Sequence, residues 1–178
     1  MVSSPTLPDF AHLKPGLAPG TYDYLEIFPR AAESPAMARV CGDDLDKLLT
    51  TSKVNLADGP GFAYVDVETP CIVLAHPYYQ DGDALDLYLD MLHELTHLRQ
   101  LRDGADLWDE RYAYVDRITE VEGYAVAVEE GRRLGMGDAE IFAHLHNPWM
   151  TQQDVERLIK HIDDLLAGRT PNVDAERV

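Results

Sequence analysis

The sequence predicts an α+β domain in which strand-like segments come first and helices follow. Three segments, at residues 21–28, 62–68 and 71–75, have the composition or the alternation that is typical of strands. From residue 83 onward, apolar residues recur three and four positions apart, the spacing that places them on one helix face. Strands followed by helices are typical of the α+β class, and 178 residues suit one domain.

The first 50 residues contain an expected irregular arm, a strand and a broken helix. Residues 1–20 carry four prolines and two glycines, a composition that predicts an irregular N-terminal arm. Residues 21–28 are aromatic and β-branched, so we expect a strand there. Ser34 followed by Pro35 is typical of a helix start, and Gly42 is expected to interrupt this helix.

Two further strands are expected around tight turns. Residues 62–68 alternate between apolar and polar side chains after a turn at 58–61, which suits a half-buried strand. Residues 71–75 form a continuous apolar run between Pro70 and Pro77. This last strand is either central and buried, or it offers its edge to an extended peptide.

Four helices are expected in the second half of the chain. They cover residues 83–104, residues 109–134, a segment that starts near 138, and residues 151–168. Asp83 and Thr151 are suitable N-cap residues, because their side-chain oxygens accept hydrogen bonds from the first amides of a helix. Gly104 and Gly135 are suitable C-cap residues.

Charge and composition exclude several functional classes. The formal net charge of −17, from 32 acidic and 15 basic residues, argues against binding to nucleic acid or to an anionic membrane. No apolar run reaches the roughly 18 residues of a membrane helix, and no signal-peptide pattern is present. We therefore expect a cytoplasmic protein in which Cys41 and Cys71 are buried free thiols. Residues 169–178 are expected to form a polar tail.

The segment from His93 to His97 reads HELTH, an HExxH motif. Residues four apart lie on the same face of a helix, so His93 and His97 can direct ring nitrogens at one metal ion. Glu94 lies about 100° further round the helix, close enough to act as a general base on a water at that metal. Leucines flank the motif, as expected for a helix inside the protein. The alternative is a structural pair of histidines.

A catalytic zinc normally has three protein ligands and one open position, so a third ligand is needed. No histidine stands at the spacing of the longer motif HExxHxxGxxH, so we expect a carboxylate on a later helix. The candidates are the acidic residues that follow the motif: Asp106, Asp109, Glu110, Asp116, Glu120, Glu122, Glu129 and Glu130.

Glu120 is the favoured third ligand because of the residues that share its helix face. At about 100° per residue, the others on this face are Ala113, Tyr124, Ala127 and Gly131. Small residues allow close packing against the histidine helix. Glu122 lies on a more solvated face and is the alternative. We therefore expect one zinc ion per chain, held by the two histidines and Glu120.

On His93, Glu94, His97 and Glu120 the chain resembles the gluzincins, zinc peptidases in which a glutamate on a following helix completes an HExxH site. The stretches HELTHLRQ and YVDRITEVEGYAVAVEEGRRLG are similar to the very small minigluzincins, over about residues 85–135. The resemblance implies one zincin-like catalytic domain over residues 21–168. In this fold a small N-terminal β-sheet packs on an active-site helix, a glutamate helix and C-terminal helices. Some minigluzincins are latent, with a chain end in the cleft.

The chain departs from the gluzincins at position 124. Many members have Asp or Asn four residues after the ligand glutamate, where it helps to orient a ligand histidine. Here that position is Tyr124, and Asp116 is a candidate replacement.

The resemblance implies a zinc-dependent metallopeptidase acting on a peptide or a small amide. Zinc would lower the pKa of a bound water toward about 7, and Glu94 would accept its proton and pass it to the leaving amine. The oxyanion needs a further hydrogen-bond donor. The candidates are Tyr124 and His76 and, beyond these, Tyr78, Tyr79, His144 and His146.

Three alternatives stay open on the sequence. The first is a zinc hydrolase of a small-molecule amide. The second is an Fe(II) oxygenase, since two histidines and a carboxylate are also its ligand set. The third is a non-catalytic regulatory module stabilised by a metal.

Overall fold

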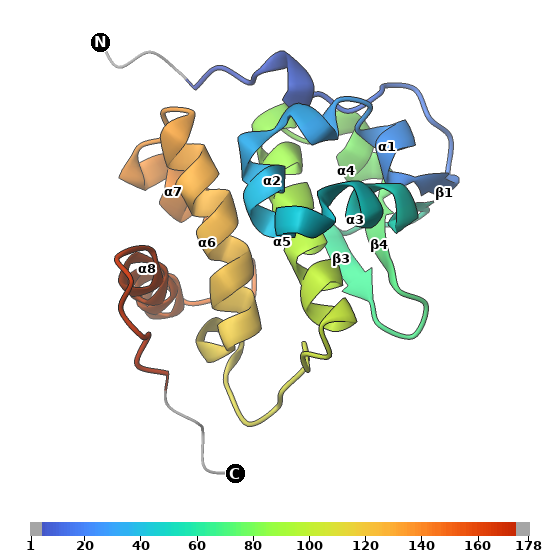
Figure 1. Ribbon diagram of the computed structural model, residues 1–178. Helices are drawn as coiled ribbons and strands as arrows, with labels where there is room; N and C mark the ends of the chain where they lie inside the picture. The colour runs from blue at the N-terminus through green and yellow to red at the C-terminus, as the bar shows by residue number, and fades with distance from the viewer. Residues whose placement is uncertain (1–4, 174–178) are drawn as a thin grey trace.

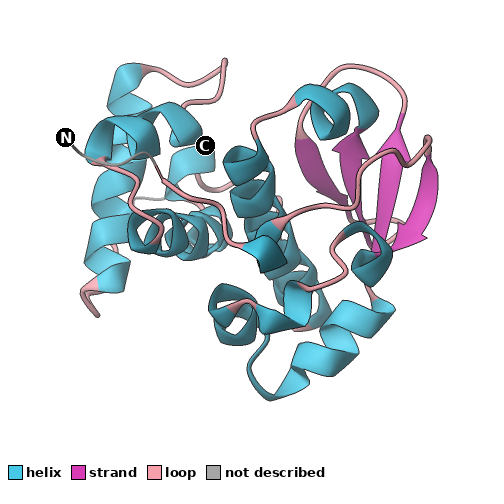
Figure 2. Cartoon of the chain, turned by 90° about the horizontal axis from the view of Figure 1, so that it is seen from above, coloured by secondary structure: helices cyan, strands magenta, loops and turns pink. Residues whose placement is uncertain are grey.

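Helix α5 (Ala84–Arg102) lies at the centre of the structure, between a β-sheet and helix α6 (Ile118–Arg133) (Figure 1). The computed structural model describes residues 5–173. Seen from above in Figure 2, the strands lie together at one side of the molecule and much of the helical part at the other. The two elements that carry the HExxH motif and Glu120 are therefore packed against each other in the interior.

The four strands form one mixed sheet in the order β1-β2-β4-β3. Their bounds are β1 (Gly20–Asp23), β2 (Lys53–Ala57), β3 (Ala63–Asp66) and β4 (Cys71–Ala75). β2 and β4 are parallel, and the two outer pairings are antiparallel. This sheet and the helices that follow it confirm the α+β class.

Strand β4 is an inner strand, paired with β2 on one side and β3 on the other. Leu74, for example, is opposite Leu56 of β2 and Ala63 of β3. All five residues of β4 are buried. The central interpretation of residues 71–75 is therefore confirmed, and the alternative in which they offer a free edge is wrong. The edge strand on this side of the sheet is β3.

The strand expected at residues 21–28 is wrong beyond residue 23, where the chain enters the short helix α1 (Tyr24–Ile27). Asp23 and Glu26 form a capping box, in which the Asp23 amide donates to the Glu26 carboxylate at 2.9 Å. Tyr24 and Ile27 are fully buried, three residues apart on one helix face. The local capping interaction thus overrides the strand preference of the aromatic and β-branched residues.

Strand β2 was not expected from the sequence. Val54 and Leu56 are buried and point to one face, with Asn55 between them. The strand has only two buried positions in five residues and directly follows a helix. Its alternation is therefore too short to indicate a strand in the sequence.

Helix α2 (Pro35–Cys41) begins where the sequence predicts. The Ser34 hydroxyl accepts a hydrogen bond from the Met37 amide at 3.2 Å. Gly42 ends the helix with φ of 55°, a left-handed conformation that favours glycine. A 3₁₀ turn (Gly42–Asp44) and helix α3 (Leu45–Thr51) then lead into β2.

Helix α5 begins and ends as expected. The Asp83 carboxylate accepts hydrogen bonds from the Leu85 and Asp86 amides at 2.9 and 3.2 Å. Gly104, with φ of 86°, follows its last turn. The helix is buried on most of its surface, because other elements cover it on several sides.

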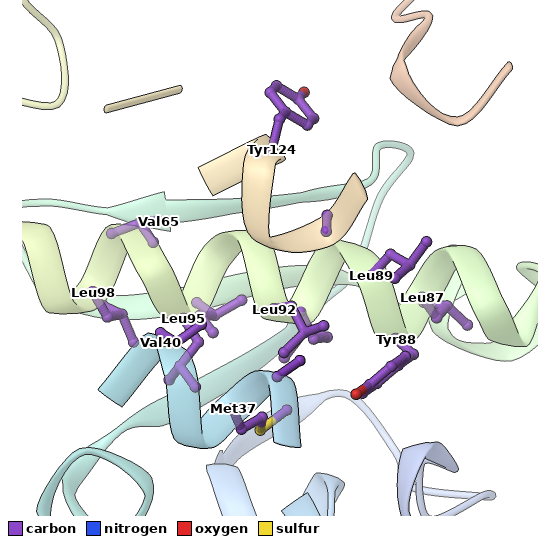
Figure 3. Packing of buried hydrophobic residues seen from close by; sticks show 14 of the residues in the cluster. Met37, Val40, Val65, Leu87, Tyr88, Leu89, Leu92, Leu95, Leu98 and Tyr124 are labelled. Carbon is purple, nitrogen blue, oxygen red and sulfur yellow. The ribbon is translucent and has the colours of Figure 1, made fainter. Parts of the chain in front are cut away.

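Leucines fix the rotation of α5 about its axis. Leu92 and Leu95 are fully buried and point toward Met37 and Val40 of α2 (Figure 3). Tyr124 of α6 lies on the opposite side of α5 in the same view. Packing against α2 therefore directs the other face of α5, which bears the histidines, toward α6.

Helix α6 starts nine residues later than the expected position 109 (118 − 109 = 9). The carboxylates of Asp106 and Asp109 accept hydrogen bonds from the amides of Trp108 and Arg111, two residues on. These local bonds compete with helical ones and hold the segment in turns. A 3₁₀ turn (Tyr114–Asp116) precedes the helix. Its end at Arg133, before Gly135, agrees with the prediction.

The remaining helices are α4 (His76–Asp81), α7 (Asp138–Leu145) and α8 (Gln152–Leu166). The last two confirm the prediction, and α8 packs on α6. Thr151 and Asp154 form the capping box of α8: the Asp154 amide donates to the Thr151 hydroxyl at 3.2 Å, and the Thr151 amide donates to the Asp154 carboxylate at 2.9 Å. Among residues 5–173, no helix is both long and apolar enough to cross a membrane. Cys41 and Cys71 are buried free thiols, as expected.

The described part of the N-terminal arm lies against α4. Its only regular piece within residues 5–19 is a 3₁₀ turn at Asp9–Ala11. The Leu17 amide donates to the Tyr79 hydroxyl at 3.1 Å, and the Leu17 carbonyl lies 2.9 Å from His76 Nε2. Residues 1–4 of the arm and 174–178 of the expected tail lie outside the described residues.

Candidate metal centre

His93 and His97 occupy successive turns of α5 on the face that meets α6. Both are buried, and their ring centroids lie 4.4 Å apart with the planes nearly perpendicular. The Nε2 atom of each ring points to the same oxygen, Glu120 Oε2, at 3.4 Å in both cases. The helical spacing of the motif therefore converges as the sequence predicts.

Glu120 comes from the first turn of α6 and is the carboxylate that joins the two histidines. The ligand atoms of His93, His97 and Glu120 all lie within 4.8 Å of one another. Within residues 5–173 no other group of three such residues has this arrangement. Glu120 is also buried, with only 6% of its surface exposed. A buried group of this kind could hold a metal ion.

The separations of the donor atoms test whether zinc fits. Four ligands at about 2.0–2.1 Å in a tetrahedron lie about 3.3 Å from one another. The observed histidine-to-carboxylate separations are 3.4 Å. This is longer than an ordinary hydrogen bond, and Glu120 Oε2 has no hydrogen-bond partner in the described chain. Two of the three donor separations thus match a tetrahedral metal, and the third, between the two histidines, lies within 4.8 Å. Three protein ligands leave one position of such a metal free.

Gly123 allows α6 to approach α5 at the first histidine. A Cβ atom at this position would lie 2.9 Å from His93 Nδ1, closer than such atoms come in real structures. Gly123 was missed, because the sequence argument placed other small residues on the Glu120 face. Of those, Ala113 precedes α6, whereas Gly131 does face α5 near Leu89.

Gln100 orients His97. Its side-chain oxygen lies 2.8 Å from His97 Nδ1, so it accepts the proton of that nitrogen and leaves Nε2 free to bind a metal. The Gln100 amide group donates to the Thr119 carbonyl at 3.1 Å and to the Glu122 carboxylate at 2.9 Å. Glu122, the alternative third ligand, thus binds Gln100, which in turn positions His97.

Asp116 does not orient either ligand histidine, so the expected replacement is wrong. Its carboxylate lies 2.9 Å from His161 Nε2 and 3.2 Å from Arg157 Nε, between the 3₁₀ turn at Tyr114–Asp116 and α8. Gln100, three residues after His97 on α5, takes the orienting position instead. The signal for it was present in the sequence, since residues three apart on a helix are neighbours.

The protonation states of the three ligand residues suit metal binding. Burial and the neighbouring His97 lower the pKa of His93 to about 4. Burial also disfavours the charged form of His97, but Glu120, Glu94 and Gln100 outweigh it and raise this pKa to about 9. The two histidines hold the pKa of Glu120 well below its usual range despite its burial. A metal ion bound here would displace the proton that Glu120 and Glu94 favour on His97.

Glu94 is a second buried carboxylate beside the two histidines. Its side chain is buried, and Oε2 has no hydrogen-bond partner within residues 5–173. Burial raises its pKa to about 8. A carboxylate with a pKa near the working pH can both accept and return a proton.

Two cavities adjoin the site, and both are lined by His93 and Glu94. The larger has a volume of about 410 Å³ and extends along α5 toward α7. The smaller, of about 140 Å³, also reaches His97 and Glu120. Two exposed aromatic side chains, Tyr64 and Trp149, line both cavities and are 54% and 65% exposed. Large exposed aromatic residues next to a buried polar group are typical of a binding site.

Tyr124 lies at the site and His76 does not. The Tyr124 ring centroid is 4.1 Å from that of His93, and its hydroxyl is 2.8 Å from the Tyr114 hydroxyl. It also accepts a hydrogen bond from the Asn147 side chain at 3.0 Å. His76 contacts the Leu17 carbonyl and lines neither cavity.

Of the other candidate donors, three line the larger cavity and one does not. Tyr78, His144 and His146 line the larger cavity. Tyr79 instead binds the N-terminal arm through Leu17 and the Lys14 carbonyl.

Several of the remaining acidic residues that were candidate ligands pair with arginines instead. Asp109 pairs with Arg111, and Glu129 pairs with Arg39. The buried Glu130 pairs with Arg133 on its own helix.

Comparison with protein-family models, with curated proteins and with solved structures gave no match. The proposed function therefore rests on the sequence motif and on the geometry of the site.

Proposed function

We propose that this chain is a zinc-dependent metallopeptidase of the gluzincin type, with His93, His97 and Glu120 as ligands and Glu94 as general base. One observation carries the proposal. A buried carboxylate that is not a ligand stands next to a three-ligand group with a free fourth position, and both face a cavity. A purely structural zinc is normally closed by four protein ligands and needs no such neighbour.

The residues around the site supply the parts of a hydrolytic mechanism. A bound zinc ion would polarise water and the substrate carbonyl. Glu94 accepts a proton at its carboxylate as the carbonyl is attacked, and it then returns that proton to the leaving amine.

The edge of the sheet supports a peptide as the substrate. β3 is an edge strand, and Ala63 and Tyr64 line both cavities. The Phe62 carbonyl accepts the Ala75 amide at 2.8 Å. Because antiparallel pairing alternates, the amides and carbonyls of Ala63 and Val65 point to the open side. An extended peptide can pair with them and cross the site.

Tyr124 is the group best placed to donate to the oxyanion. It is buried in the wall of the larger cavity and stands against His93. We favour Tyr124 because its hydroxyl is already held near the ligand ring by Asn147 and Tyr114.

Elemental analysis and peptide cleavage test the proposal together. We expect about one zinc per chain in the native protein and in Glu122→Ala, and loss of zinc in Glu120→Ala. The native protein should cleave peptides, and Glu94→Gln should keep its zinc but lose about 10²–10⁴ of the rate. A protein that never binds metal would contradict the proposal. Bound iron with activity that survives Glu94→Gln would instead support the oxygenase alternative.

A small-molecule amide is the second candidate substrate, because a cavity of about 410 Å³ lies within the range of small-molecule sites. Parallel assays on short amides and on longer peptides separate the two. Rates that rise with peptide length favour the peptidase, since a longer chain adds contacts along β3.

A further inference from the structure

The larger cavity has an acidic wall that the proposed mechanism does not use. Asp86, Asp90 and Glu94 follow one another at intervals of four on α5, and all three line the cavity. The helical rise separates them by about 6 Å per step. None of the described residues that line this cavity is lysine or arginine. Beyond Glu94, this wall of the cavity therefore carries two further carboxylates, Asp86 and Asp90, with no lysine or arginine beside them in the lining.

Asp90 is only partly satisfied by its neighbours. Its Oδ2 accepts a hydrogen bond from the Tyr78 hydroxyl at 2.6 Å. Its Oδ1 lies 3.8 Å from His144 Nε2, which is beyond hydrogen-bond distance. The Asp90 side chain is 24% exposed, so this oxygen is open to the cavity. One carboxylate oxygen is thus held in place and the other is free to accept.

His144 provides an independent indication of a ligand. Its side chain is 3% exposed, and its Nδ1 lies 2.8 Å from Asp86 Oδ1. Burial disfavours the charged form of His144, but the hydrogen bond to Asp86 and the charges of Asp90 and Asp86 outweigh it and raise the pKa of this ring. In the neutral ring, which forms above that pKa, the Nδ1 proton is donated to Asp86 and Nε2 is an acceptor. This nitrogen is buried in the cavity wall and has no partner in the described chain. Unpaired buried polar atoms are rare, because each costs free energy unless something binds it.

Aromatic rings complete this part of the cavity. The rings of Tyr78 and Phe62 meet edge to face at 5.2 Å, and Phe62 is 51% exposed. Tyr64 lies two residues further along, and all three line the cavity. Aromatic faces attract cations through their quadrupole. A cation with several N–H donors fits this part of the cavity, which offers a free carboxylate oxygen, an unpaired imidazole nitrogen and aromatic rings.

We propose that Asp90, Asp86 and His144 form a subsite that binds a cationic nitrogen of the substrate beside the scissile bond. This inference rests on the proposed peptidase function, because it names the class of substrate for that site. A lysine ammonium donates to Asp90 Oδ1 and His144 Nε2 together. The lysine side chain has a flexible four-carbon stem, long enough to span one helical step from the bond at Glu94. A substrate α-amino group carries the same positive charge, but it lies closer to the peptide backbone than a lysine ammonium does.

Binding of short peptides to the zinc-loaded Glu94→Gln protein tests the subsite without turnover. Two blocked hexapeptides of alanine carry either lysine or norleucine at a central position. A third peptide is the norleucine peptide with a free N-terminus. By isothermal titration calorimetry we expect the lysine peptide to bind about tenfold tighter than the blocked norleucine peptide. Tighter binding of the third peptide instead would identify the α-amino group as the source of the cation.

Asp90→Asn in the same background should reduce this preference to less than about threefold. Asp43→Asn is the matched control, since it removes the same charge from an exposed residue of the 3₁₀ turn at Gly42–Asp44, which lines neither cavity at the site. It should keep the preference. Equal affinity for all three peptides, no binding of the lysine peptide, or a preference that survives Asp90→Asn would each overturn the proposal.

The two proposals fail in different ways. Peptide cleavage by the native protein without any preference for a cation would overturn the subsite and leave the peptidase function. A cation preference in binding, with no cleavage of any peptide by the native zinc-loaded protein, would overturn the peptidase function and leave the subsite.

Discussion

Gly123 of α6 lies directly against the imidazole of His93 on α5. A Cβ atom at position 123 would be 2.9 Å from Nδ1 and 3.0 Å from Cε1 of that ring. The ring is also covered by Tyr124, whose centroid is 4.1 Å away. Gly123 and Tyr124 thus both come from α6, the helix that brings Glu120 to the site. The spacing between the two helices therefore sets the position of the first ligand.

Gly123→Ala should weaken metal binding without weakening the helix. The new methyl group must displace the His93 ring, and we expect zinc affinity to fall about 10–100-fold, as for other changes around ligands. Alanine is a better helix former than glycine by about 1 kcal/mol, so the helix itself gains stability. Competition with a chelator measures the affinity, and urea unfolding with a chelator in excess measures the stability of the metal-free protein.

Gly131→Ala is the matched control on the same helix. There a Cβ would meet the ends of flexible side chains, with Met136 Sδ at 2.8 Å. It should leave zinc affinity within about twofold, since no ligand is nearby. Unchanged zinc affinity in Gly123→Ala would contradict the importance of the close approach.

Gln100→Leu should also lower zinc affinity, by about 10–100-fold. The substitution removes the acceptor for His97 Nδ1, so the ring is free to take the wrong tautomer or to rotate. It also removes the link to Glu122. The measurement is again competition with a chelator. Glu122→Gln keeps the hydrogen-bonding shape of that link and should lower the affinity far less, and equal effects of the two would show that Gln100 acts mainly through Glu122.

The pair of histidines and Glu94 could be predicted from the sequence, because all three depend on the geometry of one helix. Glu120 could be favoured by the rotation of α6, although the start of α6 was misplaced by nine residues. The error did not matter for Glu120, since the helical phase is kept from position 118 onward. It did matter for Ala113, which the late start leaves outside the helix.

What could not be predicted depends on contacts between distant segments. His76 was a candidate donor to the oxyanion, yet it binds the Leu17 carbonyl, 59 residues away. The cavity wall at Asp86 needs His144, 58 residues later. Spacing along one helix indicates which residues share a face, but only packing decides what that face meets. For the same reason β3, rather than β4, is the strand beside the site.

Tyr124→Phe should lower kcat by about 10²–10³ if the hydroxyl donates to the oxyanion, as expected for the loss of one such donor. The phenyl ring keeps the contact with His93, so zinc content should not change. KM should change little, because the contact strengthens only in the transition state. Steady-state kinetics on one peptide measures both constants. A kcat within about threefold of the native value would show that the hydroxyl does not donate to the oxyanion. Its role would then be the hydrogen bonds with Tyr114 and Asn147 alone.

Glu130 should stabilise the fold in a way that depends on pH. Its side chain is fully buried and accepts two hydrogen bonds of 2.7 Å from Arg133 and one of 3.0 Å from Tyr88. Burial alone would raise its pKa, but Arg133, Tyr88 and Arg39 together lower it. The unfolded chain then binds the proton more tightly than the folded one. The stabilisation is therefore present above the unfolded pKa of about 4.3 and is lost as the pH falls through the folded value.

Glu130→Gln should consequently lower the free energy of unfolding at pH 7 by about 1–3 kcal/mol, since it weakens charged hydrogen bonds inside the protein. The difference from the native protein should shrink as the pH falls below about 4. Glu129→Gln is the matched control, because Glu129 is 47% exposed and pairs with Arg39 at the surface. That change should cost less than about 1 kcal/mol. Urea unfolding of the three proteins at pH 7 and at low pH measures these differences. If Glu130→Gln lowers the free energy of unfolding equally at the two pH values, packing rather than charge holds Glu130 in place.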